Sequence, residues 1–197
     1  MHYNTLVALS SPTRVALLDL ARTVIRHRLT NGFVTEPEIP SPTDPAFLQH
    51  AGSFVSLHDI QTHRLRGCVG RLDTGITLFE CIKHSATSVL KDPRFLDRPV
   101  TLDELPRLLI EISVISPLRP CTATDFDLET DGIYLTIGER SGCFLPQVAR
   151  ETGWTRPELL TRLCLEKLNL PPTAWQDPNA QFHAFATELI GPEPFVP

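Results

Sequence analysis

Apolar residues near the amino-terminal end of the chain recur every three or four positions, which is typical of one face of an amphipathic helix. Ser11 and Pro12 stand where such a helix would begin, and both residue types are favoured at helix starts. Gly32 follows the last apolar position, where glycine commonly ends a helix. The pattern therefore predicts a helix between these residues. Its apolar stripe consists of Val15, Leu18, Ala21, Val24, Ile25 and Leu29.

The middle of the chain combines short strand patterns with a second helical pattern. Residues 52–58 and 62–69 are strand-like runs separated by a short turn sequence, and they predict an antiparallel hairpin. Thr77 and Glu80 have the spacing of a capping box, and the apolar stripe that follows them ends at Asp92-Pro93. We therefore expect a second helix there, followed by a central strand in the β-branched run 108–115.

The last part of the chain begins with acidic residues at alternate positions of the segment 125–131. We expect a solvated strand or loop face there, because the ligand order of a calcium loop is absent. Hairpins and helices mixed in this way favour an α+β fold with antiparallel sheet and flanking helices. The further elements expected are strands at 133–137 and 143–145, a turn at 138–142, a helix at 155–168 and a strand at 182–190.

Composition narrows the class of protein. The chain has 197 residues, of which 42% are hydrophobic, and 18 Lys+Arg against 23 Asp+Glu give a net charge of −5. These values are typical of a globular chain that forms a single domain over residues 1–197. The mild acidity argues against a surface devoted to nucleic acid or anionic membrane. No run approaches the ~20 apolar residues of a membrane span, so no membrane association is expected.

Cysteine and proline usage adds two expectations. The five cysteines are odd in number, form no C-x-x-C pair and accompany no signal-peptide pattern. Reduced thiols and a cytoplasmic location are therefore predicted. Four of the 18 prolines fall between Pro37 and Pro45, so the segment from Thr35 to Pro45 is expected to be a stiff surface connection or a disordered loop.

The densest chemical feature is the segment His63–Arg71, which holds three arginines, one histidine and no acid. Side chains alternate along a strand, so Arg66 and Cys68 would share a face, near enough for the arginine to favour the thiolate. Gly67 and Gly70 flank Cys68 and would let a ligand or another backbone approach closely. The alternative is a structural cysteine packed under a helix.

Groups that could assist Cys68 are few. His63 would lie on the opposite strand face and His84 on the second helix, so neither is established as a base. Asp92 follows a helix end and could pair with Arg94 or with an arginine of the Cys68 strand. The segment is thus either part of a site or a helix stop. Metal-ligand spacings and phosphate-binding loops are absent from the sequence, so no metal and no cofactor are expected.

Taken together, these segments resemble the AMMECR-domain family over nearly the whole chain. The family's hallmark hexapeptide, leucine-arginine-glycine-cysteine-isoleucine-glycine, appears as Leu65–Gly70 with Val69 in place of isoleucine. Further landmarks of the family are matched in order by Asp92–Phe95, Ile110–Ser113, Gly132-Ile133, Leu145–Val148 and Gly153-Trp154.

The resemblance implies an α+β fold of two unequal lobes, with the hexapeptide strand lining a cleft between them. It implies no settled reaction. In bacteria and archaea, the resemblance implies that members of the family accompany a Memo-type protein and a radical SAM protein. Any chemistry shared with such partners would take place in trans, because this sequence carries neither partner domain.

Three functions follow as hypotheses. In the first, the cleft binds a small anionic ligand or supports thiol-dependent catalysis, with Cys68 as nucleophile or ligand contact and Arg66 holding the thiolate or the anion. Asp92 would orient an arginine, and Arg94 would line the same site. The second is a non-catalytic protein-binding or regulatory module whose hexapeptide is a structural strand. Nucleic-acid binding is the weakest, because basic residues on a helix usually form a solvated face. It rests on the Cys68 strand and on Arg14, Arg22, Arg26 and Arg28.

Overall fold

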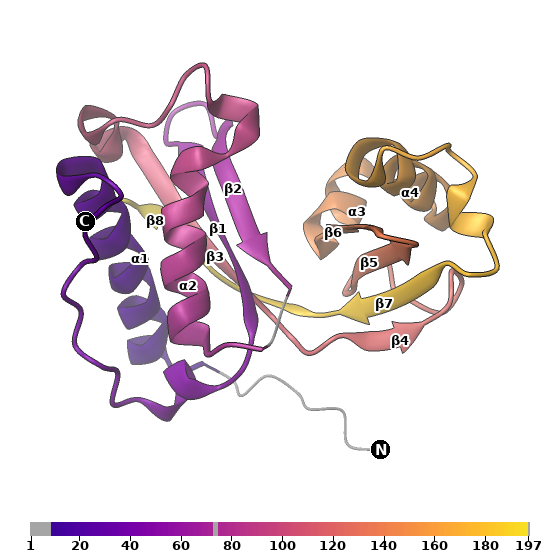
Figure 1. Cartoon of the computed structure of the whole chain (residues 1–197), viewed down its shortest axis with the longest axis horizontal. Helices are drawn as coiled ribbons and strands as arrows, with labels where there is room; N and C mark the ends of the chain where they lie inside the picture. The colour runs from indigo at the N-terminus through magenta and orange to yellow at the C-terminus, as the bar shows by residue number, and fades with distance from the viewer. Residues whose placement is uncertain (1–8, 73–74, 197) are drawn as a thin grey trace. The chain divides into compact units, whose positions relative to one another are not determined.

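The computed structural model describes residues 9–72 and 75–196. Two compact units divide these residues: Ser116–Thr187 form one, and the described residues before and after that segment form the other. Each unit is built on its own four-stranded sheet (Figure 1). The strand pairs within both sheets are antiparallel, so the α+β class predicted from the sequence is confirmed.

The sheet of the larger unit has the strand order β2-β1-β3-β8. Its strands are β1 (Gly52–Asp59), β2 (Leu65–Arg71), β3 (Leu108–Ile115) and β8 (Thr187–Pro194). β1 runs antiparallel to both β2 and β3, so the predicted hairpin and the predicted strand at 108–115 are confirmed. β2 forms one edge of this sheet.

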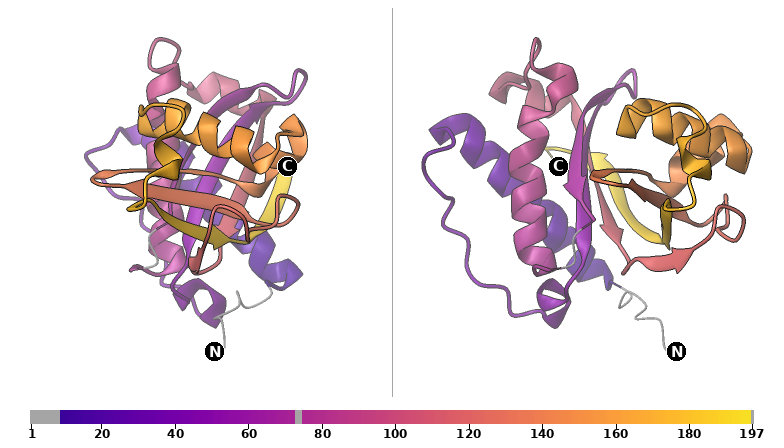
Figure 2. Two further views of the ribbon diagram at one scale, coloured as in Figure 1. Left: turned by 90° about the vertical axis from the view of Figure 1, so that its right-hand side faces the viewer. Right: turned by 45° about the vertical axis from the view of Figure 1, so that its right-hand side comes forward.

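Helices α1 (Ser11–Asn31) and α2 (Leu78–Ser88) cover one face of this sheet (Figure 2). Each begins at a residue whose side-chain oxygen accepts a backbone N–H of the first turn, Ser10 for α1 and Thr77 for α2. Gly32 ends α1 with a φ of 76°, which glycine adopts without strain. Both predicted helices are confirmed, and the α1 cap lies one residue before the expected Ser11.

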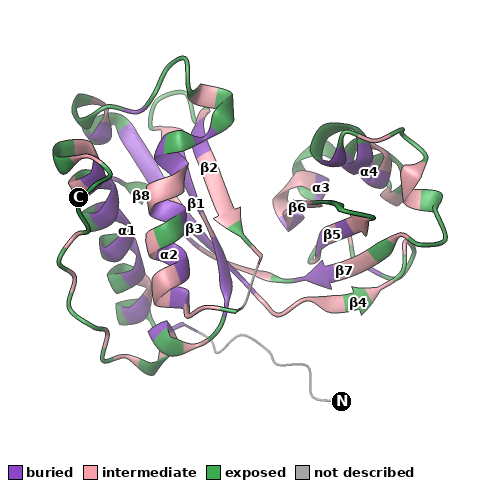
Figure 3. Cartoon of the chain, viewed as in Figure 1, coloured by how far each residue is buried: buried purple, intermediate pink, exposed green. Residues whose placement is uncertain are grey.

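The core of the larger unit lies between these helices and the sheet, and Figure 3 shows the buried residues on the inner sides of both. Val55 and Leu57 of β1 and Ile110 of β3 belong to this core. Side chains alternate along a strand, so Ser56, which lies between the two β1 residues, points to the face without helices. This alternation decides which residues accompany Cys68.

Short 3-10 helices connect the main elements of this unit. They are η1 (Pro45–Leu48), η2 (Val89–Lys91), η3 (Pro93–Phe95) and η4 (Leu102–Arg107). The proline-rich segment 35–44 contains neither helix nor strand, as expected. None of the helices in the described ranges is long and apolar enough to cross a membrane.

The smaller unit has the strand order β4-β7-β5-β6. The predicted turn at 138–142 is shorter in the structure, where Gly138 and Glu139 join the strands, so the second strand begins at Arg140 and not at residue 143. The helix α3 (Pro146–Thr152) forms where the sequence predicted no helix. It begins at Pro146, because proline is suited to the first helical position. The strands are β4 (Arg119–Cys121), β5 (Gly132–Ile137), β6 (Arg140–Phe144) and β7 (Gln181–Phe185). The helices are α3 (Pro146–Thr152), α4 (Arg156–Leu163), the π-helical turn η5 (Cys164–Leu168) and η6 (Ala174–Gln176).

The single strand predicted at 182–190 is wrong. The structure has two strands there, β7 and β8, which are separated at Ala186 and belong to different sheets. Ser116 holds the separating residue, because the Ala186 N–H donates to the Ser116 hydroxyl at 2.9 Å. The alternation of apolar residues continues while the pairing partner changes, so the pattern alone did not reveal the break.

Gly70 provides a test of the β1–β2 packing. A Cβ at this position would lie under 3.0 Å from the Ser53 carbonyl oxygen and the Phe54 ring, so Gly70→Ala is expected to lower the free energy of unfolding by about 3 kcal/mol. Gly67→Ala should cost less, because its Cβ would meet the Val89 carbonyl oxygen at 2.9 Å. Urea unfolding measures both, and wild-type stability in Gly70→Ala would contradict the packing described.

Candidate functional site

Cys68 is half-buried in the middle of the edge strand β2. It lies opposite Ser56 of β1, which in turn lies opposite Glu111 of β3. The three residues therefore form a row of thiol, hydroxyl and carboxylate on the sheet face that the helices leave uncovered. The alternative in which Cys68 packs under a helix is wrong, because α1 and α2 cover the other face. Ser56 and Glu111 were not found from the sequence, since their place in the row depends on strand register.

Asp92 and Arg94 close the open edge of β2 beside Cys68. The Cys68 N–H donates to Asp92 Oδ2 at 2.9 Å, and Arg94 Nη2 donates to the Cys68 carbonyl oxygen at 3.1 Å. The two side chains also pair with each other, with Arg94 Nε 3.0 Å from Asp92 Oδ1 and Nη2 2.6 Å from Oδ2. An edge strand normally leaves such backbone groups without a protein partner. The ion pair thus takes the place of a neighbouring strand at this one residue, and it is one of the two pairings predicted for Asp92.

The Asp92 carboxylate is only 3% exposed, yet it stays ionised. Burial opposes its ionisation, but hydrogen bonds from Arg94 and from the Cys68 N–H favour the charged form more strongly and lower the pKa to about 2. The Arg94 side chain is half exposed, so its guanidinium connects this buried carboxylate with solvent.

The thiol of Cys68 is not activated by its surroundings. Burial raises its pKa above the ordinary value, and the negative charges of Asp92 and Glu111 act in the same direction. A hydrogen bond from Ser56 and the charge of Arg94 oppose this shift without reversing it. The surroundings of Cys68 therefore favour the neutral thiol over the thiolate.

The prediction that Arg66 holds the Cys68 thiolate is wrong. A bulge interrupts the β1–β2 register at this point. Leu57 lies opposite Gly67 and His58 lies opposite Leu65, so Arg66 has no partner in the register and simple alternation does not apply. Arg66 Nε and Nη2 instead donate to the two carboxylate oxygens of Glu104 at 2.6 and 3.0 Å. Both side chains are largely buried, so the Arg66 charge is neutralised inside the fold.

The two glycines of the hexapeptide accommodate protein atoms. Gly67 faces the backbone of Val89 at the end of α2, and Gly70 lies against Phe54 of β1. The close approach predicted at these glycines is therefore made by another backbone and another side chain.

Neither candidate base is placed to serve Cys68, because His63 is exposed in the β1–β2 turn and His84 is on α2, which covers the opposite face of the sheet. In the part of the chain that the structure describes, no group of three His, Cys, Asp or Glu side chains could hold a metal ion.

This fold and site define a class of α+β protein in which the strand Leu65–Gly70 is closed by the segment Asp92–Phe95. The family model AMMECR1 matches residues 18–190, and the chain belongs to the AMMECR1 family. A protein from Thermococcus gammatolerans is 35% identical over 187 residues, covering 90% of this chain and 89% of that protein. Protein PH0010 from Pyrococcus horikoshii is 34% identical over 187 residues, covering 90% and 88%.

The comparison with solved structures gives the same family. The crystal structure of the uncharacterized protein PH0010 from Pyrococcus horikoshii matches with a TM-score of 0.83 and 31% sequence identity. The match covers 92% of each chain. The family predicted from the hexapeptide and its downstream landmarks is therefore confirmed.

Replacement of Asp92 by asparagine should have a pH-dependent effect on stability. The folded-state pKa of about 2 lies below the ordinary 3.8, so the ionised carboxylate contributes about 2 kcal/mol above pH 4, and this contribution is lost as the pH falls toward 2. We therefore expect Asp92→Asn to be less stable than the wild type by that amount at pH 7, with the gap closing near pH 2. Urea unfolding at both pH values measures it, and a gap independent of pH would contradict the assignment.

The buried pair Arg66–Glu104 predicts a non-additive effect on stability. Arg66→Met leaves a largely buried carboxylate without its partner and should cost about 3 kcal/mol, whereas Arg66→Met with Glu104→Leu should recover most of the loss. Guanidinium unfolding of the wild type, both single variants and the double variant gives the coupling energy. Additive losses in the double variant would show that the two charges do not interact.

Proposed function

We propose that this AMMECR1-family protein acts by binding, as a non-catalytic ligand-binding or regulatory module, and that Cys68 is a neutral structural and contact thiol. The observation that carries this proposal is the engagement of both charged groups beside Cys68 with its backbone. Asp92 accepts the Cys68 N–H and Arg94 donates to the Cys68 carbonyl oxygen. These two side chains bind the backbone of the edge strand β2. They are therefore positioned to support β2 and not to transfer protons.

The charges around the thiol support the same proposal. Arg66, which thiolate catalysis would need, is bound to Glu104. The charges that act on the Cys68 thiol are those of Arg94, Asp92 and Glu111, of which two are negative. Burial is the largest effect that raises the pKa of Cys68, and the two negative charges add to it, so a neutral thiol that donates a hydrogen bond is favoured over a thiolate.

Other expectations from the sequence stay predictions. These are the anionic ligand at Cys68, the cleft, the cytoplasmic location and the Memo-type and radical SAM partners. A binding module would meet such partners through surfaces that are independent of the Cys68 thiol. Cys68→Ala is accordingly expected to keep partner binding, although it removes the contact with Ser56.

The reactivity of Cys68 tests the proposal. We expect its alkylation by iodoacetamide to rise with pH along a titration curve centred above 9.0, the ordinary value that burial raises. Mass spectrometry of the Cys68 peptide measures the rate at each pH in the full-length protein. Free glutathione in the same reaction supplies the reference for an unperturbed thiol.

The double variant Arg66→Met with Glu104→Leu is the matched control, because it removes the one arginine of the hexapeptide without leaving the buried Glu104 carboxylate unpaired, and it leaves Asp92 and Arg94 in place. Under the proposal its Cys68 titration curve coincides with that of the wild type. A wild-type curve centred near pH 7 that moves upward in this double variant would overturn the proposal and restore the activated nucleophile.

A further inference from the structure

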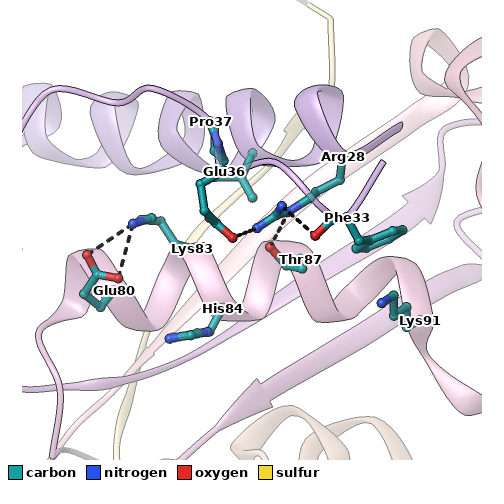
Figure 4. A pocket seen from close by; sticks show the side chains of 10 residues that line it. Arg28, Phe33, Glu36, Pro37, Glu80, Lys83, His84, Thr87 and Lys91 are labelled. Atoms are coloured by element: carbon teal, nitrogen blue, oxygen red, sulfur yellow. Dashed lines mark hydrogen bonds and ion pairs between the residues drawn. The ribbon is translucent and has the colours of Figure 1, made fainter. Parts of the chain in front are cut away.

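A second region of the larger unit has the features of a ligand site. A pocket of about 420 Å³ opens between α1, α2 and the segment 33–37 that follows α1 (Figure 4). This volume lies within the range of about 300–1,000 Å³ that is typical of small-molecule sites. Its lining includes no residue of Leu65–Gly70 or Asp92–Phe95, so it is separate from the Cys68 region.

Arg28 builds one wall of the pocket. Its side chain is buried, and its guanidinium donates to the Thr87 hydroxyl at 3.3 Å, to the Phe33 carbonyl oxygen at 3.4 Å and to Glu36 Oε1 at 2.5 Å. These bonds tie the segment after α1 to α2 and fix the shape of the pocket. The charge of Arg28 is neutralised by Glu36, so Arg28 is a positioning residue and not the ligand contact.

Lys91 supplies a cation that no carboxylate of the described residues neutralises. Its ammonium nitrogen lies 3.7 Å from the centre of the Phe33 ring. Among the described residues no carboxylate oxygen lies within 4.0 Å of this nitrogen. Lys83, at the other end of the pocket in Figure 4, differs in this respect because it pairs with Glu80 at 3.2 Å.

The wall formed by α2 and η2 presents three hydrogen-bond donors in a row. His84, Thr87 and Lys91 are spaced by three and four residues, so they share one face of the helix. The Thr87 hydroxyl accepts from Arg28 and keeps its own hydrogen for a ligand. The His84 ring is exposed and, within residues 9–72 and 75–196, makes no hydrogen bond with the protein.

We propose that this pocket binds a small organic anion, a phosphate or carboxylate attached to a flat apolar body. The anionic group contacts Lys91 and Thr87, the ligand's next polar group meets His84, and the apolar body rests on the Phe33 ring, which is 41% exposed. This inference rests on the proposed binding role and names the class of ligand.

Titration of the full-length protein with phenyl phosphate tests the inference, with ¹⁵N-labelled amides followed by NMR. We expect saturable shifts at amides of α2 and η2, and about fivefold weaker binding in Lys91→Gln. Lys91 is exposed, so this variant should keep its fold. Lys167→Gln is the matched control, because Lys167 also carries its ammonium over an aromatic ring, that of Phe144 at 5.5 Å, in the other unit. Its affinity for phenyl phosphate should equal that of the wild type.

Three further probes separate the parts of the ligand. Phenol should bind at least fivefold more weakly than phenyl phosphate because it lacks the anion, and inorganic phosphate should also bind more weakly because it lacks the body that contacts Phe33. Benzoate should bind and should lose affinity in Lys91→Gln, because the proposed class includes carboxylates. Absence of α2 shifts with both organic anions, equal affinity in Lys91→Gln and Lys167→Gln, or equal binding of phosphate and phenyl phosphate would overturn the inference.

The ligand titration and the Cys68 titration curve test the pocket and the proposed function independently. Failure of both organic anions to bind removes the pocket assignment but leaves the Cys68 titration curve as predicted. A Cys68 curve centred near pH 7 would instead overturn the non-catalytic proposal, whatever the affinity of the α1–α2 pocket.

Discussion

The hydrogen bond from the Cys68 N–H to the buried Asp92 carboxylate is the interaction on which the hexapeptide region depends. β2 is an edge strand, and its backbone groups on the outer side need partners from outside the sheet. Asp92 supplies the acceptor and Arg94 the donor for one residue, and the two charges neutralise each other. The hexapeptide therefore forms one structural unit with the Asp92–Phe95 segment, although the two are separated in the sequence.

The chemistry available at Cys68 follows from this arrangement. A carboxylate that must stay ionised to hold the strand also places a negative charge near the thiol, and Glu111 adds a second one. Burial raises the pKa of the Cys68 thiol most, and these two carboxylates act in the same direction. Arg66 does not compensate, because Glu104 neutralises it. The region resembles an active site in its residue types, but its charges support the fold. Lys91, in the pocket between α1 and α2, differs because its ammonium group lies over the Phe33 ring and has no carboxylate partner among the described residues.

Local patterns were sufficient for the elements whose signals are local. The caps and apolar stripes of α1 and α2, the hairpin, the strand at 108–115 and the pairing of Asp92 with Arg94 all followed from residues close together in the sequence. Two of the errors share a physical origin in long-range pairing. The bulge at Arg66 depends on how β2 meets β1, and the break at Ala186 depends on which sheet each half of the segment joins. Glu104 has 37 residues between it and Arg66, so no local pattern indicated their ion pair.

Amide hydrogen exchange at Cys68 reports directly on the single N–H that Asp92 accepts. We expect this edge amide to exchange as slowly as the amides by which β2 pairs with β1. In Asp92→Ala its exchange should accelerate by orders of magnitude more than that of the neighbouring β2 amides. Exchange of the wild-type Cys68 amide at the rate of an unprotected edge residue would show that Asp92 does not hold this strand.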